Sequence, residues 1–196
     1  MIIIFLNLPK KVMSSFHSLK VSNIERITSK AVVVSFEIPD SLKTEFEFLA
    51  GQYIGLQAQI NGEKVRRSYS ICSAPQSGIL QVGIKEVPKG VFSSYVNKHL
   101  AVGDILEVSA PEGRFTLTRE TNAKTLVGIA AGSGITPIMS IIKSVIIGKS
   151  DSQFVLLYGN KSPEETLFYE ELLMLEKANP RQLKIHWAFS QANVTE

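Results

Sequence analysis

The sequence has almost no cysteine, and this scarcity limits what the protein can be. Cys72 is the single cysteine among 196 residues, so the chain cannot form an internal disulfide. It also cannot supply the four thiolates that hold a plant-type iron–sulfur cluster. A chain without a disulfide framework is typical of a reducing cytoplasm, and we expect a cytoplasmic protein.

Hydrophobic runs long enough to cross a bilayer are also missing. The apolar run in MIIIFLNLPKKV is far shorter than the roughly 20 residues that a membrane-spanning helix needs. Its lysines follow the apolar residues, whereas a secretory signal places them first. Met13 is followed by SSFHSLKV and has the features of a natural start. We therefore expect no membrane role and a disordered N-terminal extension over residues 1–16.

Excess charge and metal-ligand clusters are scarce as well. The 21 basic and 18 acidic residues give a net charge of +3, and no lysine- or arginine-rich run contains interleaved aromatic residues. This pattern argues against a nucleic-acid partner. The three histidines, His17, His99 and His186, have no metal-ligand spacing, so we expect no metal site on this chain.

The first pattern that is present consists of short segments rich in β-branched residues. Turn signals such as Asn61-Gly62 separate them, and Asn-Gly between two alternating runs is a strong hairpin signal. The spacing predicts a closed six-stranded antiparallel β-barrel with one helical interlude over 92–100. The predicted strands are 18–27, 31–39, 53–60, 65–71, 79–87 and 105–110.

The second pattern begins after residue 118 and alternates unbroken apolar strands with helices. We expect strands over 125–131, 153–159 and 183–190, and helices over 137–147 and 162–179. This alternation predicts a Rossmann-like parallel sheet that is covered on both faces. The predicted domains are therefore a barrel over 17–118 and an α/β domain over 119–196.

The predicted α/β domain is C-terminally incomplete. In a doubly wound sheet the first strand is central, with the second and fourth strands as its neighbours. Here the sequence supplies only three strands, so strand 125–130 would have an apolar, unpaired edge, which natural proteins avoid. Either the chain is a fragment or something else covers that edge.

A short basic and aromatic motif, RRSYSICSAP at 66–75, is the first of three chemical signals. It places Arg67, Tyr69 and Ser70 together at the end of a predicted strand. Two adjacent positive charges are unfavourable on a strand that faces the core. The motif therefore indicates a ligand that has an anionic group beside a flat apolar surface. The alternative is a surface arginine on an edge strand.

Two glycine-containing motifs supply candidate phosphate sites. In IAAGSGITPIM at 129–139, Gly132 and Gly134 follow an apolar strand and open a helix, where backbone N–H groups meet a phosphate. In KGVFSSYV at 89–96, the segment from Gly90 to Ser93 lies at another helix N-terminus. The alternatives are a strand–turn–helix corner for the first motif and a simple serine cap for the second.

Together, these three motifs resemble the ferredoxin–NADP reductase-like family in order and spacing, over residues 17–196. The resemblance implies an FAD-binding barrel of the flavodoxin-reductase type and an NAD(P)-binding domain. The segments FHSLKV, LLYGN and FSQ are most similar to the reductase subunits of bacterial phenylacetyl-CoA oxygenase systems. Those subunits carry a C-terminal 2Fe–2S domain and a Cys-Gly nicotinamide motif, and both are absent from this chain.

The resemblance also implies residue roles. Arg67 would pair with the flavin pyrophosphate, Tyr69 would pack against the isoalloxazine, and the Ser70 hydroxyl would lie near flavin N5. Thr136 would contact the nicotinamide or the flavin, which makes Ser70, Tyr69 and Thr136 the expected catalytic residues. The expected cofactor-binding residues are Arg67, Tyr69, Ser70, Ile84, Lys85, Gly90, Val91, Phe92, Ser93, Gly132, Ser133, Gly134, Thr136, Pro137, Asn160 and Ser190. Lys85 is equally well explained as a solvated strand lysine.

These features predict an FAD-dependent NAD(P)H oxidoreductase that passes electrons to an oxygenase component or an iron–sulfur domain. Lys161, where an NAD-selective site would show an acid, and Ser190 favour NADPH over NADH. One alternative is a stand-alone NAD(P)H–flavin or ferric reductase. Another is a non-catalytic FAD-binding fragment that cannot position nicotinamide.

Overall fold

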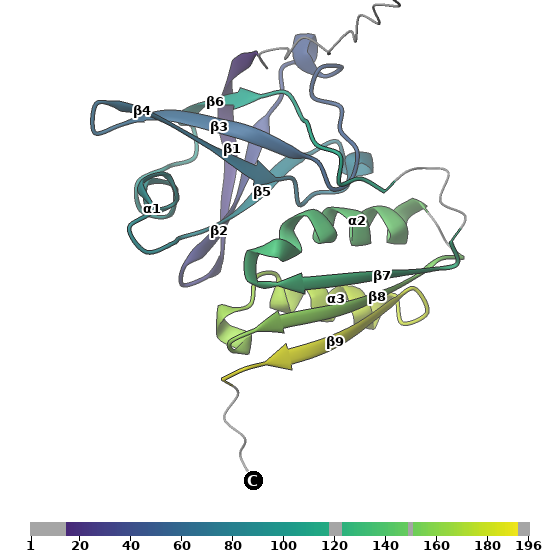
Figure 1. The fold of residues 1–196 in the computed structure, drawn as a ribbon. Helices are drawn as coiled ribbons and strands as arrows, with labels where there is room; N and C mark the ends of the chain where they lie inside the picture. Colours follow the sequence, from purple (N-terminus) through teal and green to yellow (C-terminus); the bar gives the residue numbers. More distant parts are fainter. Residues whose placement is uncertain (1–14, 118–122, 149–150, 192–196) are drawn as a thin grey trace, which may run out of the picture.

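The computed structural model describes residues 15–117, 123–148 and 151–191, which form a barrel and an α/β unit lying against it (Figure 1). The predicted N-terminal extension lies outside the described residues except for Ser15 and Phe16. Phe16 begins the first strand, so the ordered barrel starts one residue earlier than expected. The predicted boundary between residues 118 and 119 also lies outside the described residues.

The barrel confirms the six predicted antiparallel strands. Its sheet has the order β4-β3-β6-β1-β2-β5, and an isolated bridge between Ile71 and Val82 joins the end of β4 to β5. The sheet is thereby closed around the apolar side chains of its inner face. The elements are β1 (Phe16–Thr28), β2 (Ala31–Glu37), β3 (Tyr53–Ile60), β4 (Glu63–Ser70), β5 (Leu80–Lys85), α1 (Val91–Lys98) and β6 (Ile105–Ser109).

The β3–β4 hairpin fixes which residues of β4 lie opposite β3. Asn61 and Gly62 both have positive φ, 51° and 80°, as a tight primed turn requires. Ile60 therefore pairs with Glu63, and the same register continues until Tyr53 pairs with Ser70. The register places the basic and aromatic motif at the far end of β4 from the hairpin.

The α/β unit contains three parallel strands in the order β7-β8-β9. The helix predicted over 162–179 begins later than expected, because Phe168 has a left-handed φ of 60° and starts α3 as its N-cap. Leu167 and Phe168 are buried in the core, and this burial bends the chain before the helix. The elements are β7 (Thr125–Ala131), α2 (Ile135–Gly148), β8 (Gln153–Asn160), α3 (Tyr169–Ala178) and β9 (Leu183–Phe189).

Only one face of the parallel sheet is buried, so the expectation of two covered faces was wrong for the described residues. Phe154 and Leu156 pack with residues of α2 and α3. On the other face, Val127 is 64% exposed, Ile129 76% and Leu157 42%. Both crossover helices therefore lie on the same side, and β7 forms the sheet edge as the sequence predicted.

Helix α2 lies between the barrel and the sheet (Figure 1). Its buried residues, among them Ile135 and Met139, share one apolar cluster with barrel residues such as Val33 and Cys72. A helix that is apolar on nearly all sides is expected in such a position. Ser140 Oγ also donates a hydrogen bond of 2.6 Å to the Ser73 carbonyl. These contacts hold the α/β unit against the barrel and so place the two halves of the candidate site together.

In the described part of the chain, no helix combines the length and the apolar character needed to cross a membrane.

Candidate cofactor site

The three sequence motifs meet at one cavity of about 410 Å³, here called the β4–α1 cavity. It lies where β4, the start of α1 and the glycine loop after β7 come together. Segments separated by up to 70 positions in the chain thus line one cavity, and its use as a cofactor site stays a prediction. The predicted residues that line it are Arg67, Tyr69, Ser70, Lys85, Gly90, Val91, Phe92, Ser93, Ser133, Gly134, Thr136 and Pro137.

Strand β4 brings a charged fork and an aromatic ring to this cavity. The centroids of the Tyr69 and Phe92 rings lie 5.9 Å apart. Burial raises the pKa of Tyr69 to about 12, and the nearby Arg67 charge partly opposes this rise. Arg67 Nη1 donates to the Arg66 carbonyl at 2.7 Å, and no ion pair joins Arg67 to a carboxylate among the described residues. The guanidinium is therefore available to an anion.

The N-terminus of α1 has the properties of a phosphate cradle. The first N–H groups of a helix have no partner within the helix. Among the described residues no side chain caps α1, and no acid lies in its first turn, so these N–H groups remain available to an anion. Ser93 Oγ accepts a hydrogen bond from the Val87 N–H at 3.2 Å, which folds the preceding loop onto the helix. A β-carbon at Gly90 would collide with Val87 and lie 2.5 Å from Ser93 Oγ, so only glycine fits there.

Side-chain hydrogen bonds anchor the glycine loop after β7, and open space adjoins its glycines. Tyr158 Oη donates to the Gly132 carbonyl at 2.9 Å, and Thr136 Oγ1 donates to the Ser133 carbonyl at 3.0 Å. A β-carbon at Gly132 or Gly134 would meet nothing within 4 Å among the described residues, so packing requires neither glycine. The left-handed φ of 50° does favour glycine at position 132, whereas Gly134 has no such backbone requirement. Open space before a helix N-terminus suits a phosphate ligand.

A close approach between barrel and α/β unit completes this cavity, and sequence reasoning missed it. At Gly83 of β5, a β-carbon would lie 2.9 Å from Thr136 Cγ2 and 3.1 Å from Phe168 Cζ. A glycine within a strand is a sequence signal for such backbone contact, and it was available in ILQVGIKEV. Thr136 itself is buried and its hydroxyl is engaged within the loop. Its side chain therefore shapes the cavity, and its contact with a cofactor stays a prediction.

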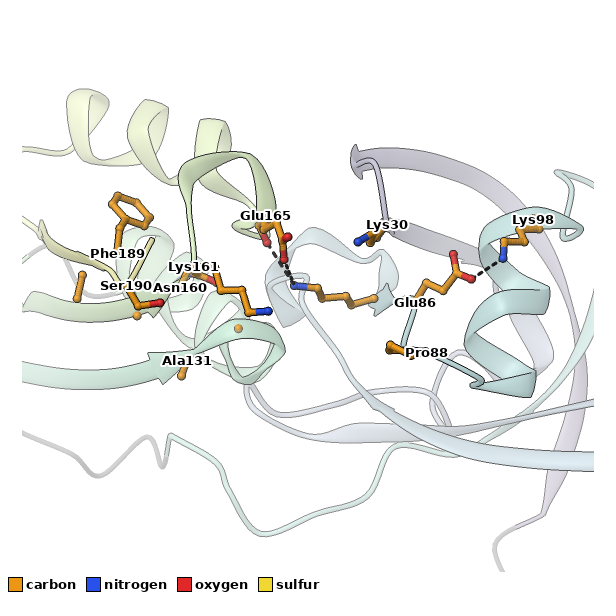
Figure 2. Close-up of a pocket in the computed structure, with 14 residues that line it drawn as sticks. Lys30, Glu86, Pro88, Lys98, Ala131, Asn160, Lys161, Glu165, Phe189 and Ser190 are labelled. Carbon is orange, nitrogen blue, oxygen red and sulfur yellow. Dashed lines mark hydrogen bonds and ion pairs between the residues drawn. The ribbon is translucent and has the colours of Figure 1, made fainter. Parts of the chain in front are cut away.

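A larger cavity of about 1030 Å³ extends between the two units and is here called the lysine cavity (Figure 2). Lys30 from the β1–β2 turn, Lys85 from β5 and Lys161 after β8 all line it. Lys85 Nζ lies 3.7 Å from Glu165 Oε2. Among the described residues, neither Lys30 nor Lys161 forms an ion pair with an acid, so the cavity retains positive charge. Sequence reasoning did not identify Lys30.

The remaining predicted residues divide between this cavity and the barrel core. Gly132, Asn160 and Ser190 line the lysine cavity. Asn160 Nδ2 is buried beside the Tyr158 side chain and makes no well-formed hydrogen bond within the described part of the chain, and a ligand oxygen would satisfy it. Ile84 is different, because its side chain is fully buried in the barrel core and its carbonyl accepts a hydrogen bond from Asn97 Nδ2. It lines neither cavity.

Family comparisons agree with the two halves of the site. Residues 18–117 match the oxidoreductase FAD-binding domain family, and residues 129–196 match the oxidoreductase NAD-binding domain family. The chain therefore belongs to the ferredoxin–NADP reductase-like oxidoreductases that combine these two domains.

Individual relatives include reductase components of oxygenase systems. One subunit of the 1,2-phenylacetyl-CoA epoxidase of Escherichia coli K12 is 37% identical over 180 residues, which are 91% of this chain and 51% of that protein. The ferredoxin reductase component of the 3-ketosteroid-9-alpha-monooxygenase of Rhodococcus rhodochrous is 33% identical over 172 residues, 86% of this chain and 48% of the relative. The chain thus spans about half the length of these relatives.

The fold is also similar to solved structures. The structure of the CS-b5R domains of human Ncb5or, in an NAD⁺ form, superimposes on this chain with a TM-score of 0.81 at 22% identity. That match covers 93% of this chain and 54% of the human chain. At this identity the similarity establishes the fold.

Proposed function

We propose that this chain is an FAD-dependent NAD(P)H reductase unit that delivers electrons to the oxygenase component of a multi-component system. The observation that carries the proposal is the convergence of Arg67, Tyr69 and the α1 N-terminus with the Gly132–Gly134 loop at one cavity. At this cavity, residues of the FAD-binding half and of the NAD-binding half would contact the same flavin ring.

The residues present fit the flavin half of such a site. Gly90 lets Val87 and Ser93 pack closely at the start of α1, and the α1 N-terminus presents N–H groups that no side chain of the described residues caps. A bound FAD would accept a hydride from nicotinamide and release the electrons one at a time. Arg67 and the α1 N-terminus would hold its pyrophosphate, because a planar guanidinium matches phosphate oxygens well. Tyr69 would orient the ring, and the Ser70 hydroxyl would donate a hydrogen bond at its reacting nitrogen.

The lysine cavity fits the coenzyme, and its charge favours NADPH. In Rossmann-type sites an acid after the second strand binds the ribose of NAD, whereas a basic residue accommodates the 2′-phosphate of NADP. Here β8 ends at Asn160 and is followed by Lys161, and Ser190 lines the same cavity. Lys30 adds a positive charge from the barrel side (Figure 2).

The acceptor is the part of the proposal that rests on relatives. Proteins named as reductase components of oxygenases match most of this chain. We extend that role to this chain, with a phenylacetyl-CoA or related aromatic-ring oxygenase as the system. Its electrons would pass to an iron–sulfur domain, because this chain has one cysteine. The single cysteine also supports a cytoplasmic location.

An acceptor assay separates this proposal from its alternatives. The chain reconstituted with FAD is supplied with NADPH or NADH and an artificial one-electron acceptor. The proposal expects coenzyme-dependent acceptor reduction that is lost when FAD is omitted. Bound FAD without turnover would instead identify a non-catalytic FAD-binding fragment. Turnover that is undiminished with free flavin as the acceptor would favour a stand-alone flavin reductase.

A further inference from the structure

Tyr158 of β8 is a buried polar side chain to which the proposed reaction assigns no role. Its hydroxyl oxygen lies behind the glycine loop, 2.9 Å from the Gly132 carbonyl oxygen and 3.4 Å from the Leu167 carbonyl oxygen. Burial raises the pKa of Tyr158 above its usual value, so the hydroxyl keeps its proton. A hydroxyl has one hydrogen to donate, and the shorter distance assigns it to Gly132.

We infer that Tyr158 is a positioning residue for the coenzyme, because its hydroxyl fixes the peptide group that follows Gly132. In that orientation the loop presents N–H groups, rather than a carbonyl oxygen, to a phosphate. The inference rests on the proposed function, since it requires that the Gly132–Gly134 loop binds the pyrophosphate of the coenzyme. Tyr158 lines neither the lysine cavity nor the β4–α1 cavity, so it acts through the loop.

The glycine loop needs such a restraint because its own residues do not supply one. Glycine adopts positive and negative φ about equally well, and Gly132 has a φ of 50°. Open space adjoins both Gly132 and Gly134. A peptide group in this loop can therefore turn over without a collision among the described residues. The turned group would point its carbonyl oxygen at the ligand, whereas helix N-termini bind phosphates through N–H groups.

Hydrogen bonds from two side chains oppose this rotation. The Gly132 carbonyl accepts from the Ile135 N–H, which belongs to the loop itself, and from the Tyr158 hydroxyl, which belongs to another strand. Strand β8 pairs with β7 up to Ala131, the residue that precedes the loop, so the tyrosine is fixed relative to the start of the loop. Thr136 Oγ1 holds the next carbonyl, that of Ser133. Both carbonyls are thereby directed towards protein donors.

The Tyr158 ring is fixed independently of its hydroxyl. Its centroid lies 5.9 Å from that of the Trp187 ring, and the side chain belongs to the apolar cluster around α2. Tyr158→Phe would therefore keep this packing and remove only the hydrogen bond. The Gly132 carbonyl would still accept from Ile135, so the variant isolates the restraint on the loop.

The test compares two ligands that differ in whether they reach the glycine loop. NADP⁺ carries a pyrophosphate, whereas adenosine 2′-monophosphate has only the phosphate that would lie at Lys161. Dissociation constants of both ligands are measured by titration calorimetry on the FAD-loaded full chain. We expect Tyr158→Phe to weaken NADP⁺ about five- to tenfold, as is usual for the loss of one hydrogen bond. Adenosine 2′-monophosphate should weaken less than about twofold.

Two further variants serve as control and as partner. Ser109→Ala is the matched control, because Ser109 is also buried and donates a hydroxyl hydrogen bond to a carbonyl, that of Ala110, within the barrel. It should leave the affinity for both ligands unchanged. Gly132→Ala disfavours the left-handed φ of the loop without altering Tyr158. If both residues act on one loop conformation, the losses of NADP⁺ affinity in Tyr158→Phe and Gly132→Ala should not add in the double variant.

Four outcomes overturn the inference. They are an unchanged NADP⁺ affinity in Tyr158→Phe, an equal loss for both ligands, and additive losses in the double variant. The fourth is a Tyr158→Phe chain that fails to fold while Ser109→Ala folds, which would assign the hydroxyl to the fold. Failure of the unaltered FAD-loaded chain to bind NADP⁺ would instead refute the proposed function.

Discussion

Replacing Arg67 with alanine tests the pyrophosphate site directly. In the structure the guanidinium donates only to the neighbouring Arg66 carbonyl among the hydrogen bonds of the described residues, and the side chain is exposed. Its loss should therefore change the free energy of unfolding of the flavin-free chain by less than about 0.5 kcal/mol. Binding should suffer more, because a hydrogen bond to a charged group contributes about 1.5–3 kcal/mol. That range corresponds to a loss of FAD affinity of roughly 12- to 150-fold.

The assay is a fluorescence titration with FAD, accompanied by thermal unfolding without flavin. Arg66→Ala is the matched control, because it removes the same charge from the adjacent position on the other face of β4. The Arg66 guanidinium lies over the Phe16 ring, 4.5 Å from its centroid, and away from the cavity lining. Equal losses of FAD affinity in the two variants would show that only general positive charge matters. Unaltered FAD affinity in Arg67→Ala would refute the assignment of the pyrophosphate site.

Three further predictions concern the flavin ring, the buried thiol and the sheet edge. Ser70→Ala should slow flavin reduction in stopped-flow experiments at equal FAD loading, and an unchanged rate would exclude Ser70 from the site. Tyr69→Ala should instead weaken FAD binding, because it removes a ring contact that contributes about 0.5–1.5 kcal/mol. Burial raises the pKa of the Cys72 thiol to about 12, above its usual value of about 8.5. Cys72 in the native chain should therefore resist alkylation at about pH 9, and rapid alkylation would contradict this. The free energy of unfolding should fall as the pH rises from about 8.5 towards 12, because only the unfolded chain can ionise the thiol in that range. Amide hydrogens of β7 should exchange faster than those of β5, because β7 is a sheet edge with an exposed face; slower exchange would mean that another chain covers it.

Local sequence signals were sufficient for most of the barrel and for the β4–α1 cavity. The β3 strand has its predicted bounds of 53–60, because its apolar pattern ends at the Asn61-Gly62 turn. The three motifs could be assigned to one site because each carries a recognisable phosphate-binding or flavin-binding feature. These features are the Arg67 guanidinium beside Tyr69, the N-terminus of α1, and the Gly132–Gly134 loop. Sequence order and spacing then connected them through family resemblance.

Features that depend on long-range packing could not be predicted in the same way. The start of α3 at Tyr169 follows from the burial of Leu167 and Phe168 against the barrel, and nothing in the segment SPEETLFYEE indicates that contact. Lys30 reaches the lysine cavity only because α2 holds the two units together. The apolar strands of the α/β unit predicted two covered faces, but the pattern does not say which segment covers each face.

The most direct test of the central claim is a single-turnover reduction without oxygen. The chain loaded with FAD is mixed with NADPH, and the oxidised flavin absorbance is followed. The account predicts that FAD remains bound and is reduced, faster with NADPH than with NADH, and that Lys161→Ala removes this preference. FAD that stays bound and oxidised with either coenzyme would contradict the claim that the Gly132–Gly134 loop and the β4–α1 cavity form one hydride-transfer site.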